Sequence, residues 1–334
     1  MPQRICIIPG DGIGQEVIPQ AVKVLDSLKL GFEFIQAEAG FDCFLRTGDS
    51  VPADTLEKVY SCQATLFGAV SSPSTRVEGY RSTIVTLRKT LDLFANLRPV
   101  QSFPITASRP NIDLMIVREN TEGLYSGREC EMDDGDTAIA ERVITRRGSQ
   151  RIVELAFKLA SRRKKHVTLV HKANVLPLTC GLFRSIGLEV AKRYPDVRCD
   201  ELLVDTMAMR LIKDPEYFDV IVTTNLFGDI LSDEASQLVG GLGLAASGNI
   251  GTTTAIFEPV HGSAPDIVGK NTANPLATIL ASSMMLEYLN HPAESQKLQK
   301  VVQETILTKN VTPDLGGSLT TSQVADHVIQ ILKG

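Results

Sequence analysis

The sequence predicts an α/β protein built on a largely parallel central sheet. Short apolar runs rich in β-branched residues alternate with helical patterns along most of the 334 residues, as where RICIIP (residues 4–9) precedes a helical pattern over residues 15–28. Strands separated by helices cannot pair as tight hairpins, and this order favours parallel pairing. With 43% hydrophobic and 22% charged residues, the chain is long enough for a large core and for two domains.

The predicted elements follow one another in a regular order. Strands are expected at residues 4–9, 32–37, 64–70, 112–117, 166–170, 201–204, 218–225 and 254–257. Helices are expected at residues 15–28, 52–60, 82–93, 148–161, 177–193, from 206, after 225, and at 275–289, 295–309 and 321–332. The acidic, glycine-containing segment from Ser126 to Asp136 differs from its surroundings, and we expect a protruding arm or hairpin there, or equally a mobile loop.

Composition excludes several classes of partner. The formal net charge of −5 gives no support to a nucleic-acid or anionic-membrane partner, and the basic cluster at residues 162–165 is typical of a solvated helix end. The six cysteines form no CxxC pair and are interpreted as reduced thiols. No leader pattern and no membrane-length apolar run is present, which predicts a soluble, cytoplasmic protein, although a processed organellar precursor would look the same.

Carboxylates gather where apolar strands end. In FDVIVTTNLFGDILSDEAS (residues 218–236), Asp229 and Asp233 are four apart and so share one helix face. Asp205 follows the strand predicted at 201–204. Such hard oxygen ligands suit Mg²⁺ or Mn²⁺, whereas the alternative is that they only complement helix dipoles.

Three arginines, Arg88, Arg98 and Arg118, are expected at or near the ends of elements. Each alone is typical of a solvated surface, but together they favour a polycarboxylate ligand, because guanidinium groups bind carboxylates through paired hydrogen bonds. Tyr125 and Lys172 are candidate acid and base. A cation-rich pocket is expected to lower the pKa of a lysine or phenol toward working pH.

Two stretches suggest a nucleotide. The turn GDGIG (residues 10–14), with Glu38 after the second predicted strand, mimics a dinucleotide-binding fingerprint but lacks the G-x-G-x-x-G spacing. His261 follows another predicted strand, and Gly262 would let a ligand approach the backbone closely. The alternative for a lone histidine is a structural role.

Taken together, the motifs PGDGIG, LRKTLDLFANLRP, RENTEGLY, HKANV, TTNLFGDILSD, EPVHGSAPDI and TPDLGG resemble the β-decarboxylating hydroxyacid dehydrogenases, and the match is collinear from about residue 4 to 317. That family holds isocitrate, isopropylmalate, homoisocitrate and tartrate dehydrogenases. The resemblance implies two α/β domains around one sheet, unlike a Rossmann fold, and so argues against a fingerprint at GDGIG. It implies a large NAD-binding domain at 1–99 plus 255–334, and a small dimerisation and metal domain at 100–254 with an arm near 126–147.

The resemblance also implies a set of site residues. The substrate contacts that it implies are Ser82, Ile84, Val85, Arg88, Arg98, Arg118, Tyr125, Lys172 and Asn174, with Tyr125 and Lys172 as the catalytic pair. Its ligands for Mg²⁺ or Mn²⁺ are Asp205, Asp229 and Asp233. Its cofactor contacts are His261, Gly262, Ser263, Ala264, Pro265, Asp266 and Asn274.

The resemblance carries two further expectations, one for the choice of cofactor and one for the assembly of subunits. A carboxylate at Asp266, where NADP-dependent members usually have lysine, implies NAD. Lys172 and Asp205 are similar to residues that serve the neighbouring subunit's site, which implies at least a homodimer, and the arm could extend it to a homotetramer. The mechanism implied is oxidation of a metal-bound hydroxyl assisted by Lys172, then loss of CO₂ with Tyr125 as proton donor, inside a cleft that closes.

The substrate is expected from the helix that begins near Ser82. Many isocitrate enzymes have asparagine at the position of Ile84, and isopropylmalate enzymes typically have glutamate at Arg81 and leucines at Ile84 and Val85. The pattern here is most similar to homoisocitrate dehydrogenases, and the absence of an arginine at Val85 disfavours isocitrate. We therefore expect conversion of homoisocitrate to 2-oxoadipate and CO₂ in lysine synthesis, with isopropylmalate or isocitrate as alternatives. A catalytically silent regulatory subunit is disfavoured because the catalytic pair and the three aspartates are all present.

Overall fold

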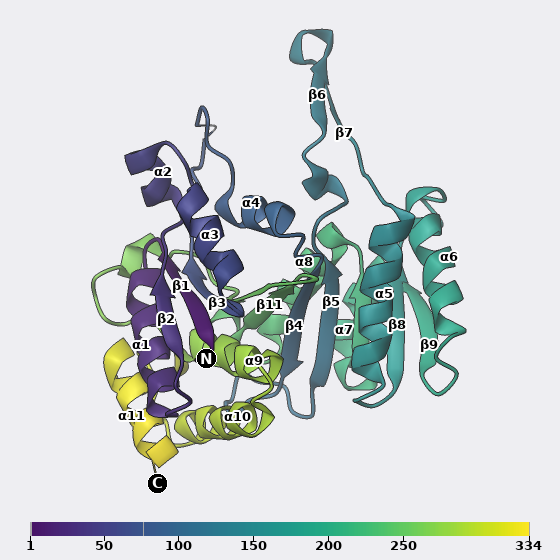
Figure 1. Cartoon of the computed structure of the whole chain (residues 1–334). Coiled ribbons are helices and arrows are strands. Elements are labelled where there is room, and N and C mark those ends of the chain that lie inside the picture. The colour runs from purple at the N-terminus through teal and green to yellow at the C-terminus, as the bar shows by residue number, and fades with distance from the viewer. Residues whose placement is uncertain (1, 76, 334) are drawn as a thin grey trace. The chain divides into compact units, whose positions relative to one another are not determined.

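The computed structural model describes residues 2–75 and 77–333, and the chain forms two compact units (Figure 1). The first unit comprises Met1–Leu91, Phe103–Ser108 and Gly240–Gly334. The second comprises Asp92–Ser102 and Arg109–Val239. The predicted domain boundaries after residues 99 and 254 stay predictions.

The strands of the first unit lie in the order β2-β1-β3-β12-β11. They are β1 (Arg4–Gly10), β2 (Glu33–Gln36), β3 (Ala64–Ala69), β11 (Ala246–Ile250) and β12 (Ala255–Pro259). All pair in parallel except β11 with β12, which are antiparallel. The helices are α1 (Gly14–Ser27), α2 (Phe41–Thr47), α3 (Ala53–Ser61), α4 (Thr83–Thr90), α9 (Leu276–Tyr288), α10 (Pro292–Leu307) and α11 (Thr321–Lys333).

Apolar spacing explains how these helices cover the strands. Helix α1 buries Val17, Ile18, Ala21, Val24 and Leu25, a repeat of three and four residues that forms one stripe. This stripe packs on β1 and β3, and α11 lies alongside α1 (Figure 1). Helix α9 is buried over most of its surface and contacts β3, β11 and β12. Together they form the large core of the first unit.

The second unit repeats the plan with strands in the order β4-β5-β10-β8-β9. They are β4 (Ala95–Gln101), β5 (Asp113–Glu119), β8 (His166–His171), β9 (Arg198–Leu203) and β10 (Val220–Thr223). Only β4 and β5 pair antiparallel; the others are parallel. The helices are α5 (Arg146–Ala160), α6 (Thr179–Ala191), α7 (Val204–Lys213) and α8 (Asn225–Gln237), and in Figure 1 α5 lies in front of the strands and α7 behind them.

Parallel pairing in the second unit brings several strand ends together. Because β5, β10, β8 and β9 run in one direction, their carboxyl ends lie along one edge of the sheet. The segments that leave these ends are residues 120–125, 224–225, 172–174 and 204–205. Most of the predicted catalytic and metal-binding residues of this unit belong to these segments or to α8.

A two-stranded hairpin projects from the second unit (Figure 1). It consists of β6 (Glu129–Met132) and β7 (Thr137–Ala140), whose eight residues are all exposed. Of the two alternatives for the segment after Ser126, the arm or hairpin is therefore the one observed. Its predicted role in assembly stays a prediction.

The α/β prediction with mostly parallel strands is confirmed, but three elements were not predicted: α2, β4 and β11. As a result, two residues lie elsewhere than expected. Arg98 lies inside β4 and not in a loop after a helix, and Asp205 lies in the first turn of α7 and not before it. Among the described helices, none is long and apolar enough to cross a membrane.

Candidate active site

Arg118 is the most deeply buried charged side chain of the second unit that the sequence singled out. It is 1% exposed, near the end of β5. Its Nε and Nη2 donate to Oδ1 of Asn225 at 2.9 and 2.7 Å, and its Nη1 donates to the carboxylate of Asp229. A Cβ atom at Gly228 would lie 2.6 Å from Cγ of Arg118, so glycine is needed there. The first turn of α8 is therefore shaped around this arginine.

Arg98 ties the two carboxylates of α8 together. Its Nη1 donates to Oγ of Ser232 at 2.6 Å and to Oδ1 of Asp233 at 2.7 Å, and its Nη2 lies 3.4 Å from Oδ1 of Asp229. The amide oxygen of Asn96, two residues earlier in β4, accepts from Nε at 2.8 Å. Because one guanidinium reaches both aspartates, their carboxylates lie on the same side of α8, as the spacing of four predicted.

Tyr125 completes this cluster from a short 3₁₀ helix, Leu124–Ser126. Its hydroxyl donates to Oδ2 of Asp229 at 2.5 Å, and the Arg118 guanidinium lies 5.2 Å from the centre of its ring. Burial raises the pKa of Tyr125, and the Asp229 carboxylate adds to this rise, outweighing the opposite effect of Arg118. The expectation that a cation-rich pocket lowers its pKa is wrong, and the phenol stays protonated near neutral pH.

The carboxylates of Asp229 and Asp233 have the donor chemistry that Mg²⁺ or Mn²⁺ requires, and their side chains are 31% and 55% exposed. Within residues 2–75 and 77–333, no three acidic, histidine or cysteine side chains are grouped so that they could hold a cation. The two aspartates thus fit as part of a ligand set, and the third predicted ligand, Asp205, is not brought to them.

Asp205 instead pairs with Lys172. The Lys172 Nζ lies 2.7 Å from Oδ1 of Asp205, and the two side chains are 23% and 64% exposed. The lysine hydrogen bond lowers the pKa of Asp205. Asn174 lies in the exposed turn that follows Lys172. This pair is open to solvent, in contrast to the Arg118 cluster.

In the first unit, Arg88 is held by two side chains of the β11–β12 hairpin. Its Nε donates to Oδ1 of Asn249 at 3.1 Å, and its Nη2 donates to Oε1 of Glu258 at 3.2 Å. Asn249 Nδ2 also donates to Glu258 at 2.7 Å. This buried network fixes the last turn of α4.

The first turn of α4 carries the residues expected to select the substrate. Ser82 immediately precedes the helix, and Ile84 and Val85 are half-buried in its first turn. Thr83, between Ser82 and Ile84, is fully buried. The accessible part of this turn is therefore mainly apolar.

The predicted cofactor loop, His261 to Asp266, follows β12. Nδ1 of His261 donates to the carbonyl of Gly262 at 3.0 Å, and burial lowers the pKa of the ring. Its Nε2 is buried, and no group in the described part of the chain lies within hydrogen-bonding distance of it. A Cβ atom at Gly262 would meet nothing within 4 Å. A buried acceptor without a donor beside open space fits an approaching nucleotide.

Asn274 is the remaining predicted cofactor contact. It is buried, and its Nδ2 donates to Oδ2 of Asp314 at 3.0 Å. Ala264 and Pro265 lead into a short 3₁₀ helix, Pro265–Ile267, which contains the exposed Asp266. The loop and Asn274 all belong to the first unit.

The glycines of GDGIG serve packing within the chain. Cβ atoms at Gly10, Gly12 and Gly14 would lie 2.0 Å from the Ala69 carbonyl oxygen, 2.2 Å from that of Ser263 and 2.1 Å from that of Pro9. At each of these three positions glycine lets another backbone segment of the chain approach closely. The structure thus agrees with the argument against a fingerprint.

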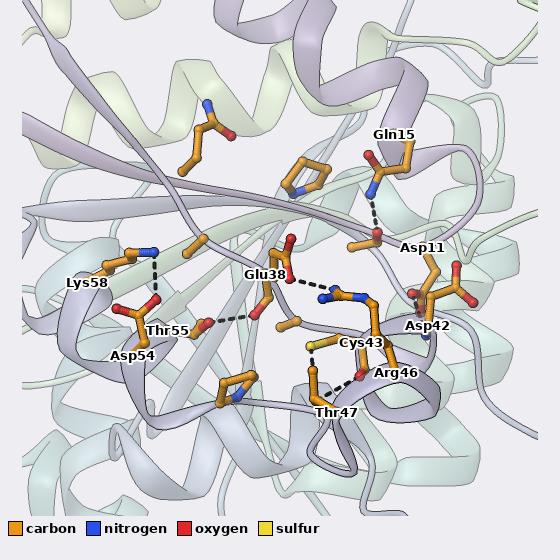
Figure 2. A pocket seen from close by; sticks show the side chains of 16 residues that line it. Asp11, Gln15, Glu38, Asp42, Cys43, Arg46, Thr47, Asp54, Thr55 and Lys58 are labelled. Carbon is orange, nitrogen blue, oxygen red and sulfur yellow. Dashed lines mark hydrogen bonds and ion pairs between the residues drawn. The ribbon is translucent and has the colours of Figure 1, made fainter.

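A cavity of about 550 Å³ lies at the carboxyl ends of β1 and β2, where a Rossmann fold would hold adenosine (Figure 2). Glu38, the acid of the apparent fingerprint, pairs with Arg46 at 2.6 Å. Asp54 pairs at 2.6 Å with Lys58, one turn later on α3, in the wall of the same cavity. These charges compensate one another, so Glu38 is not left to receive a ribose.

The sequence matches the family model described as isocitrate/isopropylmalate dehydrogenase over residues 4–328. The chain belongs to this family. It is 54% identical to the isocitrate/homoisocitrate dehydrogenase of Thermus thermophilus, covering 100% of this chain and 99% of that one. It is 51% identical to the 3-isopropylmalate dehydrogenase of Methanothermobacter thermautotrophicus, with 99% and 98% covered.

The crystal structure of isocitrate dehydrogenase from Methylococcus capsulatus is similar with a TM-score of 0.96 and 44% identity, covering 99% of this chain and 100% of that one. The predicted fold, that of the isocitrate/isopropylmalate dehydrogenases and not a Rossmann fold, is confirmed. The dehydrogenase is thus an oxidoreductase of a decarboxylating family. The three relatives described above are named for different acids, so the acid that this chain oxidises has to be inferred from its own residues.

The side chains that hold the arginines in place were not predicted from the sequence. These are Asn96, Asn225, Ser232, Asn249 and Glu258. Asn225 could have been found, because it is the last residue of the strand predicted at 218–225 and lies four residues before Asp229. Glu258 follows the strand predicted at 254–257 and gave a similar signal, whereas Asn96, Ser232 and Asn249 lie in or pack against the unpredicted strands β4 and β11 and gave none.

Proposed function

We propose that this dehydrogenase converts homoisocitrate to 2-oxoadipate and CO₂, with NAD⁺ as oxidant and a divalent cation. The observation that carries the choice of acid is the half-buried, apolar pair Ile84 and Val85 on the first turn of α4. A longer carboxylated arm can pass such a surface, whereas an arginine or asparagine suited to the shorter arm of isocitrate is absent there.

The far carboxylate of homoisocitrate needs a polar partner beyond that apolar surface. The hydroxyl of Ser82 and the exposed guanidinium of Arg81 flank the start of α4 and can supply it. Isopropylmalate, which ends in two methyl groups, would leave such a polar partner without a carboxylate to bind. One or two methylenes in an apolar pocket are worth only about 1–3 kcal/mol, so weak activity on the shorter acids is expected.

The two other carboxylates are proposed to bind the arginines. Arg98 and Arg118 are fixed by amide oxygens of Asn96 and Asn225, which leaves little side-chain entropy to lose when a carboxylate binds. Their partner Asp229 is proposed to shift toward the cation when both ligands arrive. Arg88 is proposed to contribute a third guanidinium.

The reaction balances with the groups present. When bound between Asp229, Asp233 and a further Asp205, a cation would acidify the substrate hydroxyl and stabilise negative charge on its oxygen. Lys172 is proposed to take the hydroxyl proton. NAD⁺, when bound at the loop His261–Asp266, would supply the acceptor for the hydride of the adjacent C–H, and the C–C bond to the β-carboxylate would then break to release CO₂. Tyr125, protonated near neutral pH, returns a proton to the carbon left behind.

Two parts of this assignment concern groups outside one chain. Lys172 and Asp205 are proposed to act in the partner subunit's site, which agrees with their lying apart from the Arg118 cluster and open to solvent. When NAD⁺ is bound, the exposed Asp266 is proposed to accept hydrogen bonds from its ribose hydroxyls, and this carboxylate would repel the 2′-phosphate of NADP⁺.

The test is steady-state kinetics with Mg²⁺ on homoisocitrate, isocitrate, 3-isopropylmalate and malate. We expect kcat/KM for homoisocitrate to exceed the others by about tenfold or more, and NAD⁺ to be preferred to NADP⁺. A higher kcat/KM for 3-isopropylmalate or isocitrate would contradict the interpretation of Ile84 and Val85. No activity on any acid would favour the silent regulatory subunit.

A further inference from the structure

The middle of the cofactor loop is held by contacts that the reaction itself does not explain. The backbone carbonyl of Ser263 accepts the N–H of Ile13 at 2.9 Å, and its side-chain hydroxyl accepts a hydrogen bond from Ser71 at 2.9 Å. All three residues belong to the first unit. The loop is thus tied to two other segments, the GDGIG turn and the segment that follows β3.

The conformation of the loop makes these ties necessary. Ala264, next to Ser263, has φ +42°, a left-handed conformation that costs an alanine roughly 1 kcal/mol. A loop with such a residue keeps this shape only if its surroundings hold it. Gly12 gives Ser263 room, because a Cβ atom there would lie 2.2 Å from the Ser263 carbonyl oxygen.

The backbone of Ser71 is itself held by hydrogen bonds to two side chains. Its N–H donates to Oδ2 of Asp11 at 2.8 Å, and its carbonyl accepts from the hydroxyl of Tyr80 at 3.3 Å. Asp11 is fully buried and also accepts the N–H groups of Phe41 and Asp42. A carboxylate with three backbone donors is rigid, so the Ser71 hydroxyl is held at a defined place.

We propose that Ser71 is a positioning residue for the cofactor: its hydroxyl holds Ser263, and through it the loop His261–Asp266, in the shape that binds NAD⁺. Ser71 itself touches neither cofactor nor substrate in this proposal. The inference rests on the proposed function, because that function assigns NAD⁺ to this loop. It gives the segment before α4 a role in cofactor affinity that is separate from the substrate residues on α4.

The first experiment compares Ser71→Ala and Ser71→Thr with the wild type, and uses the exposed neighbour Ser72→Ala as the matched control. Loss of one hydrogen bond predicts that S71A raises the KM for NAD⁺ by about 3- to 10-fold. At saturating NAD⁺, kcat and the KM for the acid should remain within about twofold. S71T, which keeps the hydroxyl, should restore the wild-type KM, and S72A should not change it.

A double-mutant cycle shows whether Ser71 and Ser263 affect the KM for NAD⁺ through their mutual hydrogen bond or independently of each other. If Ser71 acts through Ser263, S71A/S263A should have the same KM for NAD⁺ as S263A alone. Multiplied effects of the two substitutions would overturn the proposal. So would an unchanged KM in S71A, or a fall in kcat and thermal midpoint that S71T does not restore.

A readout without turnover distinguishes this inference from the proposed function. In free protein, S71A should speed amide hydrogen exchange in the peptide containing Ile13, whose N–H donates to Ser263, while S72A should not. Calorimetric titration with NAD⁺ should show the same loss of affinity as the KM. If the wild type binds NAD⁺ but oxidises none of the acids, the proposed function fails while Ser71 is still tested. Unchanged exchange in S71A would overturn the positioning role.

Discussion

Two buried arginines, one in each unit, are held by the same combination of groups and differ in the carboxylate. Arg88 donates to Asn249 and Glu258, and Arg118 donates to Asn225 and Asp229. The Glu258 side chain is 10% exposed, whereas that of Asp229 is 31% exposed and also accepts from Tyr125.

The difference lies in how accessible each carboxylate is. Oε1 of Glu258 accepts from both Arg88 and Asn249, and the buried carboxylate serves as the counter-ion of Arg88. Asp229 is reached by two arginines and a phenol and remains partly open, so it can exchange one partner for a cation. Similar hydrogen bonding thus leaves the carboxylate beside Arg88 enclosed and the carboxylate beside Arg118 accessible to a ligand.

The largest expected effect comes from exchanging the two carboxylates for amides. Asp229→Asn should lower kcat/KM by at least about 10³-fold, because it removes a proposed cation ligand. Glu258→Gln should lower kcat/KM by less than about tenfold but reduce the free energy of unfolding by about 3 kcal/mol, since a buried guanidinium loses its counter-ion. Urea unfolding and steady-state kinetics on both variants measure this. If E258Q lost more activity than D229N, the comparison would be reversed.

The next effect concerns the open pair Lys172 and Asp205. Lys172→Ala should lower kcat by about 10²-fold or more with an unchanged thermal midpoint, because exposed ion pairs add little to stability. Tyr125→Phe should show a similar loss. If the sites are shared between subunits, mixing and refolding the two variants should recover about a quarter of wild-type activity, since half of the dimers then contain one intact site. No recovery would mean that both residues act within one chain.

Smaller effects are expected from alanine substitutions at two glycines, Gly228 and Gly262. Gly228→Ala should destabilise the protein by about 1–3 kcal/mol and lower activity, because its Cβ would collide with Arg118. Gly262→Ala should leave the thermal midpoint unchanged and raise the KM for NAD⁺ by about tenfold, because only a ligand would occupy the space beside it. A G262A protein with normal NAD⁺ affinity would remove this loop from the cofactor site.

The smallest effect is a dependence on pH. Burial and Asp229 raise the pKa of Tyr125 in the folded protein above the value of about 10 expected for an unfolded chain. Its O–H hydrogen bond therefore stabilises the fold fully below pH ~10 and is lost as pH rises through the folded pKa. The difference in unfolding free energy between wild type and Y125F should be constant from pH 7 to 9 and decrease above pH ~10. A decrease beginning near pH 8 would contradict the raised pKa.

Much of the fold could be predicted from the sequence because burial and periodicity agree in most elements. The fully buried strands β3, β8 and β10 appear as apolar runs, and the stripe of α1 appears at helical spacing. Strand β4 could not be predicted, since ANLRPVQ contains a proline and a buried arginine whose partners Ser232 and Asp233 come from α8. Strand β11 (ASGNI) contains a glycine and no continuous apolar run, so nothing in the sequence indicated a strand there.

The candidate site could be predicted as a set of residues but not as an arrangement. Asp229 and Asp233 were placed together by a spacing of four, which the helix preserves. The pKa of Tyr125 was predicted in the wrong direction, because burial and its contact with Asp229 depend on how η1 (Leu124–Ser126) packs on α8. No periodicity carries that information.

The most direct test of the central claim is to measure NADH and CO₂ together when the wild-type protein and the D229N variant act on homoisocitrate with NAD⁺ and Mg²⁺. The wild type should form the two products in equal amounts, and D229N should form neither at a comparable rate. Formation of NADH without CO₂, or undiminished turnover in D229N, would contradict the assignment of oxidative decarboxylation to the cluster around Arg118 and Asp229.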